Sequence, residues 1–215
     1  LFQESEVYEL INEFGNYAYD RDDIVTCESI YRSCLEIGEI NQNRKLIGTA
    51  YNGLSRAAFY LNKFEEARTY VERASWFLEG TGMCDEQIKS LFIQGSIQYS
   101  MDDYEESRHS MEKALALTDS VNDLYINDTK IDILSILCAV LCNIGDPVHA
   151  LDLAKQMVNL SSLATRRSTV LQASAVLAMC EYFNEHLERT VQIHQESQLL
   201  MERFPLRFWC SLMDT

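Results

Sequence analysis

The sequence contains few residues that interrupt helices. Among its 215 residues there are two prolines, Pro147 and Pro205, and eight glycines. Both residue types are costly inside a helix, because proline lacks a backbone donor and glycine loses the most conformational freedom on folding. Strand signals are also absent. We therefore predict an all-α fold in which long helices alternate with short breaks.

Long apolar runs are missing as well. No stretch approaches the roughly eighteen consecutive apolar residues of a membrane span, and the opening six residues, LFQESE, have neither a basic start nor an apolar core. We expect no membrane span and no signal peptide. Because the sequence starts at Leu1 without a methionine and stops soon after Trp209, we expect a segment of a longer protein.

Positive charge is scarce. There are 18 lysines and arginines against 33 aspartates and glutamates, which gives a formal net charge of -15. Binding to nucleic acid or to an anionic membrane requires clustered basic residues, so both partners are disfavoured. A cationic partner and simple solubility both remain compatible with this charge.

Disulfide bonds are not expected, because the cysteine count is odd and most cysteines lie within apolar helical patterns. Such residues usually act as small buried hydrophobes in a reducing compartment, so we predict a cytoplasmic protein. The seven cysteines are Cys27, Cys34, Cys84, Cys138, Cys142, Cys180 and Cys210.

The sequence does contain an internal repeat. The residues from Leu54 to Ala74 match those from Gln94 to Ala114, with each matched pair 40 positions apart. One small residue marks the second helix of each of five units, at spacings of 40, 40, 43 and 40. These residues are Cys27, Ala67, Ser107, Ala150 and Thr190.

Each unit is predicted to be a helical hairpin whose two helices touch through small residues, such as Ser55 with Ala67 and Gly95 with Ser107. Apolar residues at i, i+3 and i+7 form the core stripe of the first helix. A single hairpin cannot cover this stripe, so we predict that the hairpins stack into a right-handed superhelix. The two clearest stripes are Ile11, Phe14 and Ala18, and Tyr51, Leu54 and Ala58.

The two central units resemble tetratricopeptide repeats, through Ala50 to Leu54 with Asn62 to Ala67, and through Gln94-Gly95 with Asp103 to Ser107. Their longer period is similar to that of repeats in bacterial peptide-responsive regulators and in sensory regions of transcription activators. The resemblance implies one repeat domain over 1–215. Its units are 8–41, 48–81, 88–121, 131–164 and 171–204, followed by 205–215 as a C-terminal cap or linker.

No enzymatic constellation is evident, and no cofactor or metal is predicted. Cys138 and Cys142 share a helix face, but zinc sites normally use four ligands with paired short spacings. The acidic run Asp102 to Glu106 lacks the oxygen spacing and central glycine of a calcium loop, and it is suited to capping a helix. Glycine-rich phosphate loops and nucleophile elbows are absent from the sequence. The segment is therefore expected not to be an enzyme.

A ligand site is predicted from the exposed stripe of each first helix, because the resemblance implies that these helices line a concave groove. Asparagine can donate to and accept from a peptide backbone, arginine and lysine can bind a carboxylate, and aromatic rings can form apolar pockets. In the alternative interpretation the two basic residues only balance nearby carboxylates. The predicted groove residues are Asn12, Asn16, Asn52, Arg56, Phe59, Lys89, Phe92 and Tyr99.

Two functions are compatible with these features. The first is a sensory or regulatory module in signalling and transcription regulation, which binds a peptide or protein in the groove. The second is a static interaction scaffold or self-association domain, with a homodimer as one form. The apolar segment Phe204 to Trp209 fits either a cap over the last hairpin or a contact with a further domain or a second copy.

Overall fold

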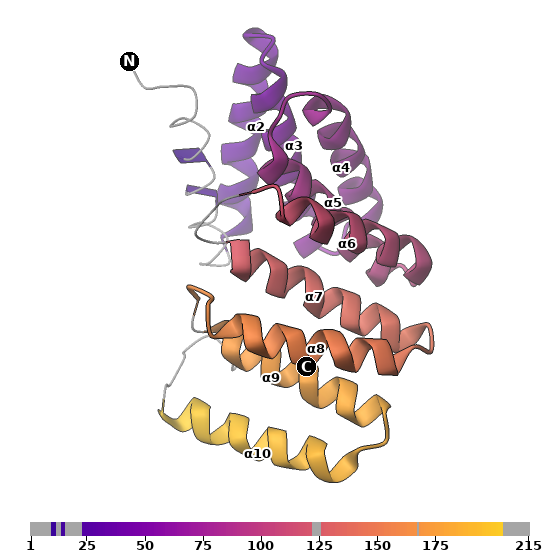
Figure 1. Cartoon of the computed structure of the whole chain (residues 1–215). Helices are drawn as coiled ribbons and strands as arrows, with labels where there is room; N and C mark the ends of the chain where they lie inside the picture. Colours follow the sequence, from indigo (N-terminus) through magenta and orange to yellow (C-terminus); the bar gives the residue numbers. More distant parts are fainter. Residues whose placement is uncertain (1–9, 12–13, 16–22, 122–125, 167, 204–215) are drawn as a thin grey trace. The chain divides into compact units, whose positions relative to one another are not determined.

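The computed structural model describes residues 10–11, 14–15, 23–121, 126–166 and 168–203, and helices are the only regular elements in this part of the chain. They alternate with short turns (Figure 1). None of these described helices is long and apolar enough to cross a membrane. The helices are α2 (Ile24–Ile40), α3 (Arg44–Tyr60), α4 (Phe64–Leu78), α5 (Cys84–Ser100), α6 (Tyr104–Thr118), α7 (Ile126–Asn143), α8 (Pro147–Ser161), α9 (Ser168–Phe183) and α10 (Leu187–Arg203).

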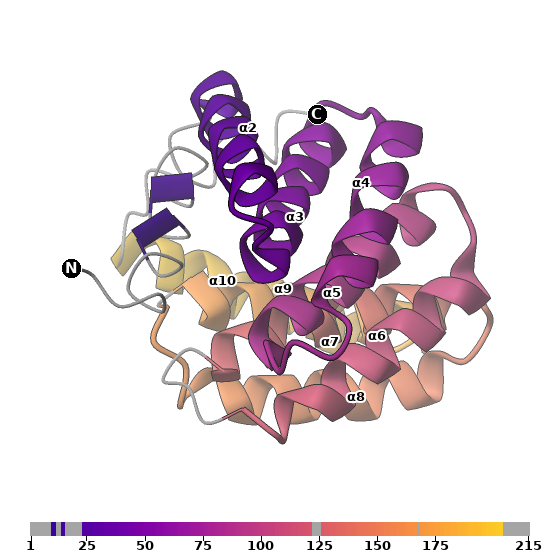
Figure 2. The same cartoon turned by 90° about the horizontal axis from the view of Figure 1, so that it is seen from above.

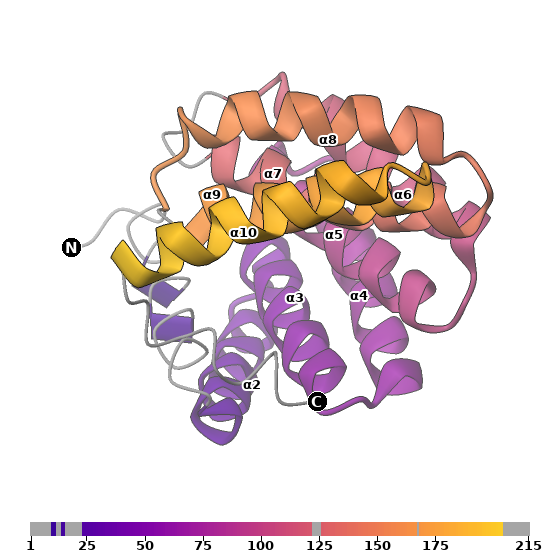
Figure 3. The same cartoon turned by 90° about the horizontal axis from the view of Figure 1, so that it is seen from below.

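The chain forms two compact units, Leu1–Val121 and Asn122–Thr215. In unit 1 each helix from α2 to α6 packs on the next, and α3 also packs on α5; Figure 2 shows α2, α3 and α4 side by side. In unit 2 α7 to α10 pack in the same sequential way, α7 also contacts α9, and α10 runs along α9 in Figure 3. This arrangement confirms the predicted all-α array of stacked hairpins, while the right-handed superhelix stays a prediction.

The hairpins begin slightly earlier than the predicted units. The helices α3, α5, α7 and α9 start at residues 44, 84, 126 and 168, whereas the units were placed at 48, 88, 131 and 171. The three to five residues that precede each predicted start therefore form the first turn of the helix. The first helix of the first predicted repeat (residues 8–41) lies almost entirely outside the described residues, as does the segment 205–215.

The small residues lie at the predicted contact in the four hairpins that the structure describes in full. A side chain on one helix donates to the backbone carbonyl of the small residue twelve positions away on the other helix. The donors and acceptors are Ser55 Oγ to Ala67 O at 2.7 Å, Ser107 Oγ to Gly95 O at 2.7 Å, Cys138 Sγ to Ala150 O at 3.4 Å and Thr190 Oγ1 to Ala178 O at 3.5 Å. Small side chains thus bring the backbones together, and the contacts made by Ser55, Ser107 and Cys138 also satisfy buried polar groups.

The turns within the hairpins repeat in the same register. The residues Asn62, Asp102, Gly145 and Glu185 all have positive φ angles, from 56° to 86°, two positions after a first helix ends. The helix α8 begins as predicted. Asp146 accepts a hydrogen bond from the His149 amide at 3.3 Å, and Pro147 lies in the first turn.

The core stripe of α3 is buried as expected, with Tyr51, Leu54 and Ala58 at most 5 % exposed. Phe14 was predicted to lie in the equivalent stripe of the first repeat (residues 8–41), but it is 57 % exposed. The described helices leave this position uncovered, so the predicted burial of Phe14 is wrong.

Gly53 should not tolerate a methyl group. A Cβ atom built at Gly53 would lie 2.3 Å from ring carbons of Tyr31, which is 2 % exposed on α2. Replacing a mid-helix glycine by alanine usually stabilises by about 1 kcal/mol. Here we expect Gly53→Ala to destabilise unit 1 by about 1 to 2 kcal/mol, because the rigid ring must move. Urea denaturation followed by circular dichroism measures this change, and a stabilised variant would contradict the contact.

Candidate functional site

The first helices of the two complete hairpins in unit 1, α3 and α5, contain most of the predicted groove residues. In α3 every residue from Leu46 to Ser55 is buried, which leaves only its ends accessible. This helix packs on α2, α4 and α5, and ten successive residues without a charge suit such an enclosed position. The accessible part of this inner face therefore lies along α5 and the C-terminal end of α3.

Asn52 lies in the contact between α3 and α5, not on an open groove, and it is 4 % exposed. Its Nδ2 donates to the Glu86 carbonyl and to Glu86 Oε2, both at 2.9 Å, and its Oδ1 accepts from Ser90 Oγ at 2.7 Å. The predicted accessible position is thus wrong for Asn52. The physical reason is that the predicted stripe faces the neighbouring first helix, where a buried amide must be fully hydrogen-bonded.

Glu86 is a buried charge that the sequence did not reveal. It is fully buried, and its Oε1 lies 2.6 Å from the ammonium of Lys89, whose side chain is 43 % exposed. A buried carboxylate without partners would be costly, and here both of its oxygens have one, Asn52 Nδ2 at Oε2 and Lys89 Nζ at Oε1. Lys89 therefore balances a carboxylate, as the alternative interpretation expected, and it still reaches the surface.

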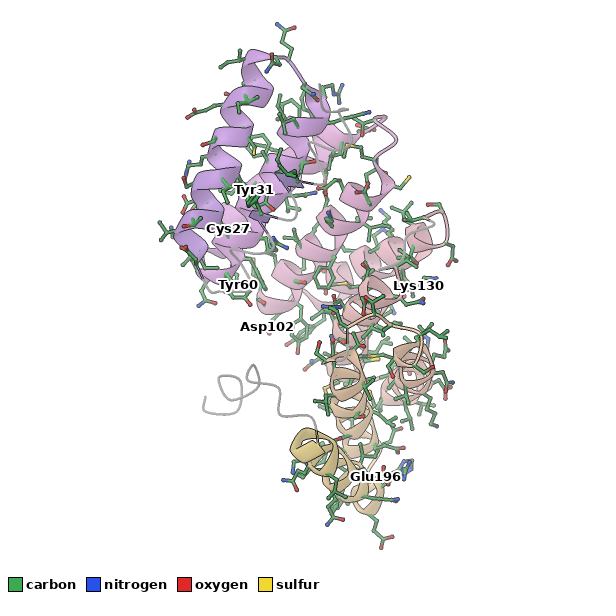
Figure 4. The ribbon with its side chains drawn as sticks, turned by 90° about the vertical axis from the view of Figure 1, so that its left-hand side faces the viewer. Cys27, Tyr31, Tyr60, Asp102, Lys130 and Glu196 are labelled. Carbon is green, nitrogen blue, oxygen red and sulfur yellow. The ribbon has the colours of Figure 1, made fainter. Side chains whose placement is uncertain are left out.

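Arg56 lies near α2. Burial raises the pKa of Tyr31 to about 12, and the positive charge of Arg56 partly offsets this effect. Burial also raises the pKa of Cys27, which is opposed by the charge of Arg56 and by a hydrogen bond between the two side chains. Figure 4 shows Cys27 and Tyr31 one turn apart on α2. Arg56 is thus held by buried groups and is half-buried itself.

Aromatic residues lie at the turns of both complete hairpins of unit 1. The ring centroids of Phe59 and Phe64 are 5.8 Å apart, and those of Tyr99 and Tyr104, 40 positions later, are also 5.8 Å apart. Both pairs have tilted rings, which is a favourable aromatic geometry. All four residues are half-buried, so each pair offers an apolar edge to a partner.

Five of the eight predicted residues thus reach the surface of unit 1 from α3 and α5, while Asn52 is buried. Asn12 and Asn16 lie outside the described residues. We call the accessible set the inner surface of unit 1. It consists of Arg56, Phe59, Lys89, Phe92 and Tyr99.

A shallow cavity between α4 and α5 was not predicted. Its volume is about 100 Å³, which is enough for a few water molecules or for part of one side chain. The sequence could not reveal it, because its walls come from helices of two hairpins. It is lined by Arg68, Val71, Glu72, Gln94, Ile97, Gln98, Met101 and Asp103.

In unit 2 the contact between the first helices α7 and α9, which corresponds to the contact of Asn52 with Glu86 between α3 and α5, is also a polar network. Asp128 accepts from the backbone amides of Thr165 and Arg166 at 3.2 and 3.1 Å, and Arg166 Nη2 lies 2.7 Å from Asp132. Burial would raise the pKa of Asp128, but the hydrogen bonds from Thr165 and Arg166 and the guanidinium charge hold the pKa below its usual value. These contacts hold the loop that precedes α9 against α7.

The cysteines of unit 2 behave as small buried residues. Cys138, Cys142 and Cys180 are at most 6 % exposed, and burial raises the pKa of Cys142 to about 12. Protonated thiols are poor metal ligands and nucleophiles. Across the described ranges, no three His, Cys, Asp or Glu side chains are placed to hold a metal ion.

Comparison with known proteins identifies the repeat. Residues 88–120, which span α5 and α6, match the tetratricopeptide repeat model. No curated protein sequence matches the chain.

Solved structures with the same fold cover nearly the whole chain. A Podosopora anserina protein described as a kinesin light chain with nearly identical TPR-like repeats aligns at a TM-score of 0.64 and 13% identity, over 91% of this chain and 93% of that chain. RapI in its apo form aligns at 0.67 and 14%, over 88% of this chain and 54% of its own. A Pyrococcus horikoshii signal-transduction ATPase with a tetratricopeptide repeat sensor aligns at 0.70 and 16%, over 96% of this chain and 31% of its own. Residues 88–120 thus form a tetratricopeptide repeat, and the chain has the fold of tetratricopeptide repeat proteins.

Proposed function

We propose that this domain binds a peptide or a segment of another protein on the inner surface of unit 1, and that it acts by binding rather than by catalysis. The observation that supports the proposal is that α3 and α5, which pack on each other, both carry half-buried aromatic and basic residues: Arg56 and Phe59 on α3, and Lys89, Phe92 and Tyr99 on α5. Aromatic and arginine residues contribute most to binding energy in protein interfaces. The presence of this chemistry in both complete hairpins of unit 1 suits an extended ligand.

A sensory or regulatory role, in signalling or transcription regulation, follows as the finer proposal. One structure with this fold is the tetratricopeptide repeat sensor of a signal-transduction ATPase, of which this chain spans about a third. In such an arrangement, ligand binding to the repeats would change the activity of a domain fused outside this segment. The reducing environment expected for free cysteines suits a cytoplasmic sensor.

The experiment begins with a peptide library panned against the whole chain, followed by calorimetry with the selected peptide. Phe92→Ala and Arg56→Gln should each weaken binding about tenfold, which corresponds to about 1.4 kcal/mol. Trp76→Ala and Arg68→Gln are matched controls on the second helix α4, where both side chains are exposed. They should leave the affinity unchanged, and thermal midpoints exclude unfolding as the cause.

The static scaffold is the second candidate, supported by exposed apolar residues on α10, such as Val191 at 55 % and Leu199 at 61 %. If both inner-surface variants bind the peptide as tightly as the wild type, the inner-surface proposal is overturned. Loss of binding in the α4 variants would instead place the ligand on the opposite helices.

A further inference from the structure

The cavity between α4 and α5 lies on the side of α5 that faces away from the inner surface. Ile97 and Met101 line this cavity, and they follow Phe92 by five and nine positions. At about 100° per residue, they lie about 140° and about 180° around the helix from Phe92. A ligand in the cavity therefore needs no contact with the inner surface.

The repeat shows why a cavity forms between these two helices. In the equivalent contact between α2 and α3, one period earlier, Tyr31 occupies the position of Val71 and Leu54 occupies the position of Gln94. Tyr31 and Leu54 are each 2 % exposed. Val71 is smaller than the tyrosine, and the amide of Gln94 is polar, so the space that apolar packing fills in the earlier contact stays open here.

Two carboxylates at the cavity make no ion pair with the rest of the described chain. Asp23 and Asp146 stand at the position of Asp103 in two other hairpins, and each accepts a hydrogen bond from the amide three residues later. Asp103 also precedes a helix, but its side chain makes no such bond. Among the described residues, neither Asp103 nor Glu72 pairs with a lysine, arginine or histidine.

The remaining lining makes the cavity acidic at its rim and apolar at its floor. Arg68, the basic residue of the lining, lies 2.5 Å from Glu65, which is not part of the lining. Its charge is therefore already balanced. Val71 and Ile97 form the floor, and each is 1 % exposed. An apolar floor below acidic groups suits a side chain that has an aliphatic stem and a cationic end.

We propose that this cavity binds a lysine or arginine side chain of a partner protein. The aliphatic stem lies over Val71 and Ile97, and the cationic group pairs with Glu72 and Asp103. The net charge of -15 attracts a basic partner to this chain, and the cavity gives that attraction a defined position.

A short peptide with a single charge tests this contact. The probe is Gly-Ser-Lys-Ser-Gly, acetylated and amidated so that the lysine carries its only charge. We expect it to shift the carbon-13 methyl NMR signal of Met101 in a saturable way, and Met101→Leu identifies that signal. A peptide with norleucine in place of lysine has the same stem without the charge, and it should bind about fivefold more weakly. A Met101 signal that does not respond to the lysine peptide would overturn the proposal.

Removal of the two carboxylates separates a defined pairing from the general attraction between an acidic chain and a cation. Glu72→Gln combined with Asp103→Asn should weaken binding of the lysine peptide about fivefold. Glu36→Gln combined with Asp152→Asn makes the same change of net charge at exposed positions of α2 and α8, and it should leave the affinity unchanged. Equal weakening by the two pairs of substitutions would contradict pairing at the cavity.

Filling the cavity gives an independent test of the site. Met111 occupies the position of Val71 one period later and is fully buried, so Val71→Met introduces a side chain that the repeat already accommodates. We expect this variant to keep its thermal midpoint and to bind the lysine peptide about fivefold more weakly, because the stem loses its place. Phe92→Ala on the inner surface should not affect this peptide. A stable Val71→Met protein that binds as tightly as the wild type would place the contact elsewhere and overturn the proposal.

Discussion

Replacing Asn52 by alanine should destabilise unit 1 by about 2 to 4 kcal/mol, because the amide makes three buried hydrogen bonds, one of them to a carboxylate. The variant removes Nδ2, which donates to both the backbone carbonyl and Oε2 of Glu86. It also removes Oδ1, which accepts from Ser90 Oγ. Glu86 would then remain buried with one donor fewer. Urea denaturation of the purified chain, followed by circular dichroism, measures the loss.

Two further variants make this prediction specific. Asn143→Ala removes an exposed amide that donates to Ala139 O one turn earlier, and it should change stability by less than about 0.5 kcal/mol. Adding Glu86→Gln to Asn52→Ala should restore part of the loss, since the buried group is then neutral. If Asn52→Ala is as stable as the wild type, the assignment of Asn52 to the α3 and α5 contact is wrong.

Ala67→Leu should also destabilise unit 1, by about 2 to 3 kcal/mol. Ala67 is fully buried, and its carbonyl accepts from Ser55 Oγ at 2.7 Å across the hairpin. A larger side chain must push the helices apart, which costs packing and weakens this hydrogen bond.

Ala116→Leu is the control for helix propensity and added apolar volume. Ala116 is exposed on α6, so this variant should stay within about 0.5 kcal/mol of the wild type. An Ala67→Leu protein with an unchanged denaturation midpoint would show that the small residue does not set the distance between α3 and α4.

The repeat register could be predicted from the sequence because side-chain size is a local property. Ser55 with Ala67 and Gly95 with Ser107 are each twelve residues apart, and the loop between them is too short to allow another pairing. The positions of Asp146 and Pro147 were predictable for the same reason, since capping depends on neighbouring residues.

The orientation of the inner face could not be predicted, because it depends on how one hairpin packs on the next. Asn52 and Glu86 are 34 positions apart, and their contact is set by packing between hairpins. A buried glutamate is also rare, so composition alone favoured an exposed Glu86. The uncharged run from Leu46 to Ser55 was the one available signal that α3 is enclosed.

The most direct test of the central claim is amide hydrogen exchange of the whole chain with and without a peptide selected from the library. The proposed function predicts added protection in α5 and at the C-terminal end of α3, around Arg56, Phe59, Lys89, Phe92 and Tyr99, with little change in α4 and α6. Protection confined to α4 and α6, or to unit 2, would contradict binding on the inner surface of unit 1.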